Sequence, residues 1–259
     1  MKSQSWDSTA VILCGLGLFL LLGQAIQPPT LSAAAPSVQA VTPEPYLVKD
    51  INPGTDTSTY NVRMTNVNGT LFFVANDGTH GAELWKSDGT EAGTVMVKDI
   101  NPGSGYSTPA IEVADWVNVN GVLYFIATDG VHGSELWRSD GTEAGTTMVK
   151  DIAAGSYGAL DAAMELCASG NTLFFKAVES TYGSTVWKSD GTEAGTASVA
   201  GIELNFLGGL KVVGDTLFFT GDDEVHGIEL WKSDGTAAGT VMIKDIYPGP
   251  DGSGPETLG

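Results

Sequence analysis

Histidine side chains recur at fixed places in this sequence and are the first candidates for chemistry. His80, His132 and His226 are the only three histidines, and each stands five residues before a tryptophan. Imidazole is a common zinc ligand. However, these histidines belong to different copies of a repeat, which would lie too far apart to share one ion. We therefore expect structural histidines that hydrogen-bond to neighbouring groups, and no metal centre.

Acidic side chains recur in the same way. An aspartate precedes glycine in every copy, at Asp88, Asp140, Asp190 and Asp234. One interpretation is an Asp-Gly turn whose carboxylate accepts hydrogen bonds from nearby amides. The other is a calcium ligand, because oxygen-rich turns can bind this ion. No Asp-x-Asp-x-Asp-Gly loop is present, so we expect the turn, with no cofactor, and keep calcium as the alternative.

Repeated glutamates form a third set, at Glu83, Glu135 and Glu229. We expect them to hold neighbouring loops in place. The third copy has Thr185 at this position, so one copy must manage without the carboxylate.

Catalysis or selective binding would need side chains that are not repeated, and the linkers between the copies supply them. The candidate ligand-binding residues are Asp56, Tyr60, Tyr106, Glu112, Tyr157, Asp161 and Asn205. Paired carboxylates could hydrolyse glycosides, and tyrosines could stack on sugars. The sequence contains no Gly-x-Ser-x-Gly, His-Glu-x-x-His or phosphate-binding loop. We therefore predict no catalytic residues, and binding on the face that carries the linkers.

The elements that would position these residues belong to one unit that occurs four times. The copies of its most regular part are Glu83 to Thr94, Glu135 to Thr146, Thr185 to Thr196 and Glu229 to Thr240. Each copy predicts four short antiparallel strands. A dipeptide such as Asn68-Gly69 supplies the turn between the first two strands, because it tolerates positive φ angles. The third strand carries a tryptophan, and the Asp-Gly turn leads into the fourth.

The spacing between these signals predicts how the units are joined. The third-strand tryptophans of the four copies are Trp85, Trp137, Trp187 and Trp231, so their separations are 52, 50 and 44 residues. The separation between hairpin turn and tryptophan is 17 residues in every copy, as from 68 to 85. All variation in length therefore falls in the linkers. Rigid four-stranded units of about 40–50 residues are typical of β-propeller blades, whereas β-helix coils are shorter and immunoglobulin-like sandwiches longer.

We therefore predict an all-β fold, a β-propeller-like array of four-stranded antiparallel blades with four full repeats and an incomplete ring. The domain spans 41–259, and its repeats span about 62–100, 110–152, 162–202 and 210–246. Residues 46–51 resemble a fourth strand that has no unit of its own. The tail after Ile246 resembles a linker, which predicts that the array continues in a longer protein. A closed four-bladed ring is the alternative.

Residues 1–40, at the N-terminus, have the pattern of a signal peptide followed by a spacer of small residues. Ala10 to Leu22 is an apolar run of 13 residues, short for a membrane span, and Val38 to Ala40 is a plausible cleavage site. We expect a secreted or cell-surface protein, with an uncleaved membrane anchor as the alternative. Removal of the signal would leave Cys167 as a single cysteine, which we expect to be a small buried hydrophobe.

The charge of the chain limits its partners. Twelve basic and 31 acidic residues give a net charge of -19. Such a surface repels phosphate backbones, so we predict no nucleic-acid binding, and contact with a membrane only through the N-terminal segment.

The repeat resembles the ELWxxDGT repeat family of bacterial secreted proteins. Glu83-Leu84-Trp85 and Asp88-Gly89-Thr90 carry the signature, which recurs in the second and fourth copies and is altered in the third. The resemblance covers about residues 46–250 and implies a propeller-like fold and an extracellular setting. It implies no activity, so no catalytic residues are transferred.

We predict a non-catalytic extracellular module for binding, adhesion or envelope structure, with an unidentified extracellular protein or polysaccharide as partner. Two alternatives stay open. One is a secreted polysaccharide hydrolase or lyase, and the other is a calcium-stabilised repeat protein.

Overall fold

The computed structural model describes residues 44–54, 56–58, 63–107, 116–153, 155, 165–178, 184–199 and 204–255. The chain divides into two compact units, Met1–Pro45 and Tyr46–Gly259, and all described strands belong to the second. The predicted signal segment, 1–40, lies outside the described residues. No helix in the described ranges is long and apolar enough to cross a membrane.

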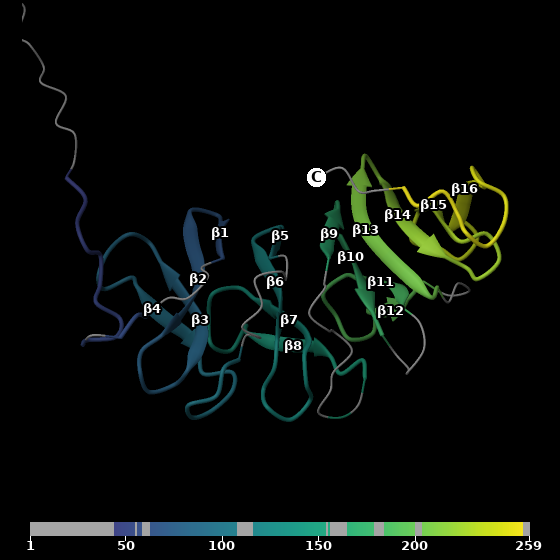
Figure 1. Cartoon of the computed structure of the whole chain (residues 1–259). Helices are drawn as coiled ribbons and strands as arrows, with labels where there is room; N and C mark the ends of the chain where they lie inside the picture. The colour runs from purple at the N-terminus through teal and green to yellow at the C-terminus, as the bar shows by residue number, and fades with distance from the viewer. Residues whose placement is uncertain are drawn as a thin grey trace, which may run out of the picture. The chain divides into compact units, whose positions relative to one another are not determined.

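The described residues form sixteen strands, which pair antiparallel in sequence order into four sheets of four (Figure 1). The first sheet comprises β1 (Met64–Val67), β2 (Thr70–Asn76), β3 (Ala82–Ser87) and β4 (Val95–Lys98). The second comprises β5 (Val117–Val119), β6 (Val122–Ala127), β7 (Glu135–Ser139) and β8 (Thr147–Lys150). The third comprises β9 (Leu166–Ser169), β10 (Thr172–Ala177), β11 (Thr185–Ser189) and β12 (Ala197–Ser198). The fourth comprises β13 (Phe206–Val213), β14 (Thr216–Asp222), β15 (Ile228–Ser233) and β16 (Val241–Lys244).

The turn residues explain the hairpins between the first two strands. In the first sheet, Asn68 and Gly69 have φ angles of 51° and 87°, as a type I′ turn requires. In the third sheet Gly170 has a φ of 55°, while Asn171 does not have a positive φ, which is the pattern of a type II′ turn. Both turns match the right-handed twist of the strands that they join.

The core lies between the sheets, and the third-strand tryptophans are part of it. Trp137 of the second sheet is buried in one cluster with Leu84 and Val97 of the first. Trp187 and Trp231 are buried in the same way against the second and third sheets. A sheet that is apolar on both faces, with neighbours on either side, is the blade of a propeller. The predicted all-β, propeller-like array of four full units is therefore confirmed.

Equivalent polar contacts join successive sheets, as the first and second sheets illustrate. The Lys86 ammonium donates to the carbonyl of Gly141, 2.7 Å away. Lys98 donates to the carbonyl of Thr146 at 2.8 Å, and its ammonium lies 6.0 Å from the centroid of the Trp137 ring. The Phe72 ring packs on Gly141, where a Cβ would lie 3.1 Å from it. The first sheet thus contacts the Asp-Gly turn of the second sheet, the residue before β8 and the tryptophan of β7.

The predicted lone strand at Tyr46–Ile51 is not a strand in the structure. The prediction was wrong because a strand needs a hydrogen-bonded neighbouring strand, and no described strand pairs with this segment. Its side chains nevertheless occupy the expected position. Lys49 donates to the carbonyl of Thr94 at 2.8 Å, as Lys98 does one unit later, and Ile51 packs on the cluster around Trp85. The segment therefore covers the first sheet as a fourth strand of a preceding unit would.

Two further predictions need correction. The fourth sheet begins at Phe206, not near Leu210, because β13 contains a bulge between Gly208 and Lys211 that lengthens it. Cys167 is half-buried, not fully buried, and packs against the cluster between the third and fourth sheets.

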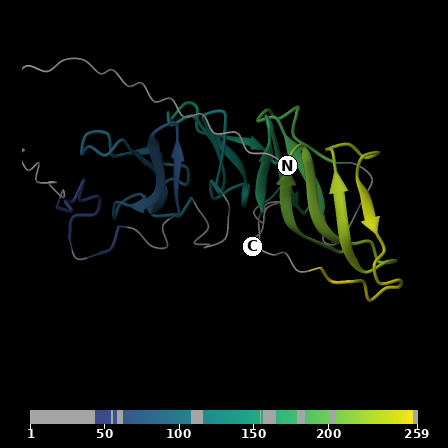
Figure 2. The ribbon, with the colours of Figure 1, turned by 90° about the horizontal axis from the view of Figure 1, so that it is seen from above.

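The described array is not a closed ring. The first strands of successive sheets contact one another, from β1 to β5, β9 and β13. In two perpendicular views, the first and fourth sheets lie at opposite ends of the row (Figures 1 and 2). The prediction of an incomplete ring is therefore confirmed, and the fourth sheet has one face without a neighbouring sheet.

Candidate functional site

The described linker residues lie beside the loops that join the second and third strands. Ser107 donates from its amide to the carbonyl of Ala82 at 3.1 Å, and its own carbonyl accepts from the amide of Thr128. One linker residue thus connects the second-to-third-strand loops of two successive sheets. We call this edge of the array, with its linkers and second-to-third-strand loops, the linker face.

Of the seven candidate residues, the structure describes Asp56, Tyr106 and Asn205, and all three are exposed. They come from three different linkers, so no cluster of non-repeated groups is established among them. The remaining four, Tyr60, Glu112, Tyr157 and Asp161, lie outside the described residues.

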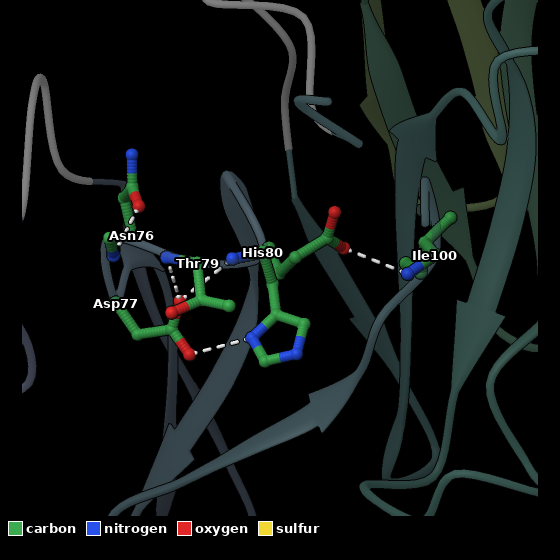
Figure 3. A network of polar contacts seen from close by, with 7 residues as sticks. Asn76, Asp77, Thr79, His80 and Ile100 are labelled. Atoms are coloured by element: carbon green, nitrogen blue, oxygen red, sulfur yellow. Dashed lines mark hydrogen bonds and ion pairs between the residues drawn. The ribbon is translucent and has the colours of Figure 1, made fainter. Parts of the chain in front are cut away.

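A histidine–aspartate pair stands in the linker-face loop of three sheets. In the first, the Nδ1 atom of His80 lies 2.7 Å from Oδ2 of Asp77, and Oδ1 of Asp77 accepts from the amides of Thr79 and His80 (Figure 3). Because the carboxylate stabilises the charged ring, it raises the pKa of His80 above its usual value.

The other two pairs repeat this geometry. They are His132 with Asp129 and His226 with Asp223, at 2.7 and 2.8 Å. The histidine side chains stay 37–39% exposed, so solvent and ligands can reach the rings. The third copy has Tyr182 where the other copies have histidine, and this residue lies outside the described residues.

The Asp-Gly turns lie at the opposite edge of the sheets, and their polar groups are used within the turn. Oδ1 of Asp88 accepts from the amide and the hydroxyl of Thr90, at 2.9 and 2.7 Å. These bonds lower the pKa of Asp88. The carboxylate also fills the space that a side chain at Gly93 would need. The buried Ser87 and Thr94 hydroxyls meet at 2.8 Å beneath the turn.

The other Asp-Gly turns have the same bonds, at Asp140, Asp190 and Asp234. The repeated Ser-Asp-Gly-Thr sequence is therefore explained by the geometry of its own turn. Among the described residues, no group of three or more His, Cys, Asp or Glu side chains is placed to hold a metal ion.

The repeated glutamates are fully buried and point at the start of the linkers. Glu83 accepts from the amide of Ile100 at 2.9 Å (Figure 3) and from that of Asn101 at 3.4 Å. Burial disfavours its charged form and raises the pKa of Glu83 to about 7. Glu229 is equally inaccessible; burial raises its pKa, but hydrogen bonds from Ser253, Tyr247 and Ile246 together lower the pKa below its usual value.

The third unit replaces the missing glutamate with main-chain pairing. Ser184 and Leu204 form an antiparallel bridge, with N···O distances of 2.9 and 3.3 Å. Glu165, a linker carboxylate, accepts from the amides of Gly209 and Leu210 in the next sheet, and so it also has a structural role.

Sequence reasoning missed two features of the linker face. The partners of the histidines, three positions before each, had a signal that could have revealed them: Asp-x-x-His recurs in three copies. The exposed apolar residues beside them, Val131 and Val225, had no such signal because they follow no pattern of burial. Together with Tyr106 they give the linker face a few apolar contact points.

No protein-family model matches the chain, and neither does any curated protein sequence. Among solved structures, the chain is similar to puromycin hydrolase at 17% identity, with a TM-score of 0.46, over 70% of this chain and 28% of that one. It is similar to TolB from Acinetobacter baumannii at 10% identity, with a TM-score of 0.41, over 64% and 38%. It is similar to the computationally designed Ika8 protein at 14% identity, with a TM-score of 0.40, over 78% and 54%. The chain thus spans less than two thirds of each of these proteins, and similarities at this level have no bearing on activity.

Proposed function

We propose that this chain is a non-catalytic, extracellular binding module of the ELWxxDGT repeat type, and that it contacts its partner through the linker face. The observation that carries the proposal is the repetition of one exposed group along this face. Three sheets each present an imidazole held by an aspartate, and two of them add an exposed valine.

Because an equivalent histidine–aspartate pair occurs on three of the sheets, the linker face suits a partner that is itself repetitive. A polysaccharide chain, or an extended segment of an extracellular protein, could contact several sheets at once. Weak contacts that are made together give a useful total affinity, because each further contact is intramolecular. Tyrosine and histidine rings can stack on sugar faces, and the net charge of -19 favours neutral or basic partners.

The other repeated polar groups support a role without catalysis. The aspartates of the Asp-Gly turns are bonded within their turns, and the buried glutamates bond to linker amides. These groups have structural partners, and their bonds account for their repetition.

A glycan array probed with the purified protein tests the proposal. Binding that His132→Ala and Tyr106→Ala both weaken would support it. The matched control is Glu143→Ala, an exposed residue in the Asp-Gly turn region at the opposite edge. Binding lost equally in the control, or turnover of a bound glycan, would contradict it.

A further inference from the structure

The outer face of the fourth sheet is an apolar surface without the cover that the other sheets have. Ile246 is 57% exposed, whereas its counterpart Ile100 in the first unit is 3% exposed. Val213 is 64% exposed, whereas its counterpart Val67 is 4% exposed. In the first two units the next sheet covers these positions: Val67 and Ile100 are buried, Val119 is buried, and Ile152 packs against the same cluster as Val119. The face therefore has the composition of an interface between sheets.

The polar groups that join sheets are also without partners here. Lys86, Arg138 and Lys188 each donate to the carbonyl of the Asp-Gly turn glycine in the next sheet, at 2.7–2.9 Å. Their counterpart Lys232 is exposed and makes no hydrogen bond in the described part of the chain. The same holds for Lys244, the counterpart of Lys98.

The complementary surface exists on the first sheet. Gly89, in its Asp-Gly turn, is exposed with no atom within 4 Å of a Cβ placed there. The matching glycines of the later sheets, Gly141, Gly191 and Gly235, are all buried under a ring of the preceding sheet. Among the described residues before the first sheet, the segment that contains Lys49 and Ile51 covers the rest of this surface, around Trp85.

We propose that two copies of this chain associate head to tail, with the fourth sheet of one copy packing on the first sheet of the next. In this arrangement β16 and Ile246 displace residues 46–51 of the second copy. Lys244 then donates to the Thr94 carbonyl in place of Lys49, so that no acceptor is lost. Lys232 gains the Gly89 carbonyl, and the exposed Val213 and Ile246 become buried.

The sequences of the two competing segments support this exchange. Residues 46–51 and 241–246 share Lys-Asp-Ile at matching positions. The first segment is not a strand, and its Tyr46 and Leu47 are 75% and 77% exposed. A complete sheet buries more apolar surface than this segment does, which favours the displacement. Because the contact joins two different surfaces, it can extend into longer arrays.

This proposal is tested by sedimentation velocity of the full chain, measured over a range of protein concentrations at 0.15 and 0.5 M salt. We expect mass to rise with concentration, and more at high salt, because each copy carries a net charge of -19. Ile246→Asp should weaken association about tenfold or more. Lys49→Met and Ile51→Asp should strengthen it by loosening the competing segment. Val131→Asp, which also places a charge at an exposed valine, is the matched control and should change nothing.

Three outcomes would overturn the proposal. The chain could stay monomeric throughout. Association could persist in Ile246→Asp, which would assign it to another surface such as the N-terminal apolar run. Association could be lost in Ile246→Asp but unaffected by Lys49→Met and Ile51→Asp, which would indicate pairing of two fourth sheets.

Discussion

Replacing Lys98 with methionine tests the contact that joins successive sheets. The substitution keeps most of the apolar stem over Trp137 and removes the ammonium that donates to the Thr146 carbonyl. A hydrogen bond from a charged donor contributes about 1.5–3 kcal/mol. The contact is partly exposed, so solvent screening puts it at the lower end, while the cation–π contact adds about 0.5 kcal/mol. We expect a loss of about 1–2 kcal/mol in the free energy of unfolding.

The repeat supplies its own controls for this experiment. Lys244→Met removes the same charge at the same position of the fourth sheet, where no following sheet is present, and should change stability by less than about 0.5 kcal/mol. Lys49→Met should cost slightly less than Lys98→Met, because Lys49 makes the equivalent hydrogen bond to the Thr94 carbonyl, whereas the cation–π contact is recorded for Lys98. All three variants have the same net charge, so global electrostatic effects cancel in the comparison.

Urea denaturation at low protein concentration measures these differences. With a slope of about 2 kcal/mol per molar urea, the Lys98 and Lys49 variants should unfold at roughly 0.5–1 M less urea than the parent. Equal shifts in the Lys98 and Lys244 variants would refute the reasoning, because the loss would then not depend on a following sheet. An unshifted Lys49 variant would refute the docking of residues 46–51.

Four further predictions concern single groups. Leu84→Ala should cost about 3 kcal/mol of stability in urea denaturation, since this fully buried side chain fills the space between two sheets. The pKa of Glu83 is raised in the folded state, so its stabilising contribution is complete below pH 4.5 and is lost as the pH rises through 7; the stability of the parent relative to Glu83→Gln should fall across this range. Glu229 has a lowered pKa, so the corresponding comparison with Glu229→Gln should show the opposite slope, with stability lost as the pH falls below 4.5. NMR titration should place the pKa of His132 above 6.5, and Asp129→Asn should bring it back.

The fold was accessible from the sequence because its signals are local and repeated. Asn68-Gly69 defines a hairpin turn by itself, and the constant distance from this turn to Trp85 defines the strands between them. Strands that are apolar on both faces require neighbouring sheets on both sides, and the structure shows this for the second and third sheets.

The details that the sequence could not supply depend on partners elsewhere in the chain. Residues 46–51 have the sequence of a strand, yet a strand forms only beside another strand. The early start of β13 depends on a bulge at Gly208 that resembles a linker in sequence. At the candidate site, the pairing of His80 with Asp77 could have been predicted from the sequence, because the Asp-x-x-His spacing recurs. The exposure of Val131 could not have been predicted, because it follows from the shape of the loop.

The most direct test of the sheet-on-sheet packing is NMR of the indole of Trp137. The structure buries this ring in one cluster with Leu84 and Val97, which precede it by 53 and 40 residues and belong to the previous sheet. We predict nuclear Overhauser contacts from the indole protons to the methyl groups of both residues. An indole with contacts only to its own sheet would contradict the packing, and the linker face that depends on it.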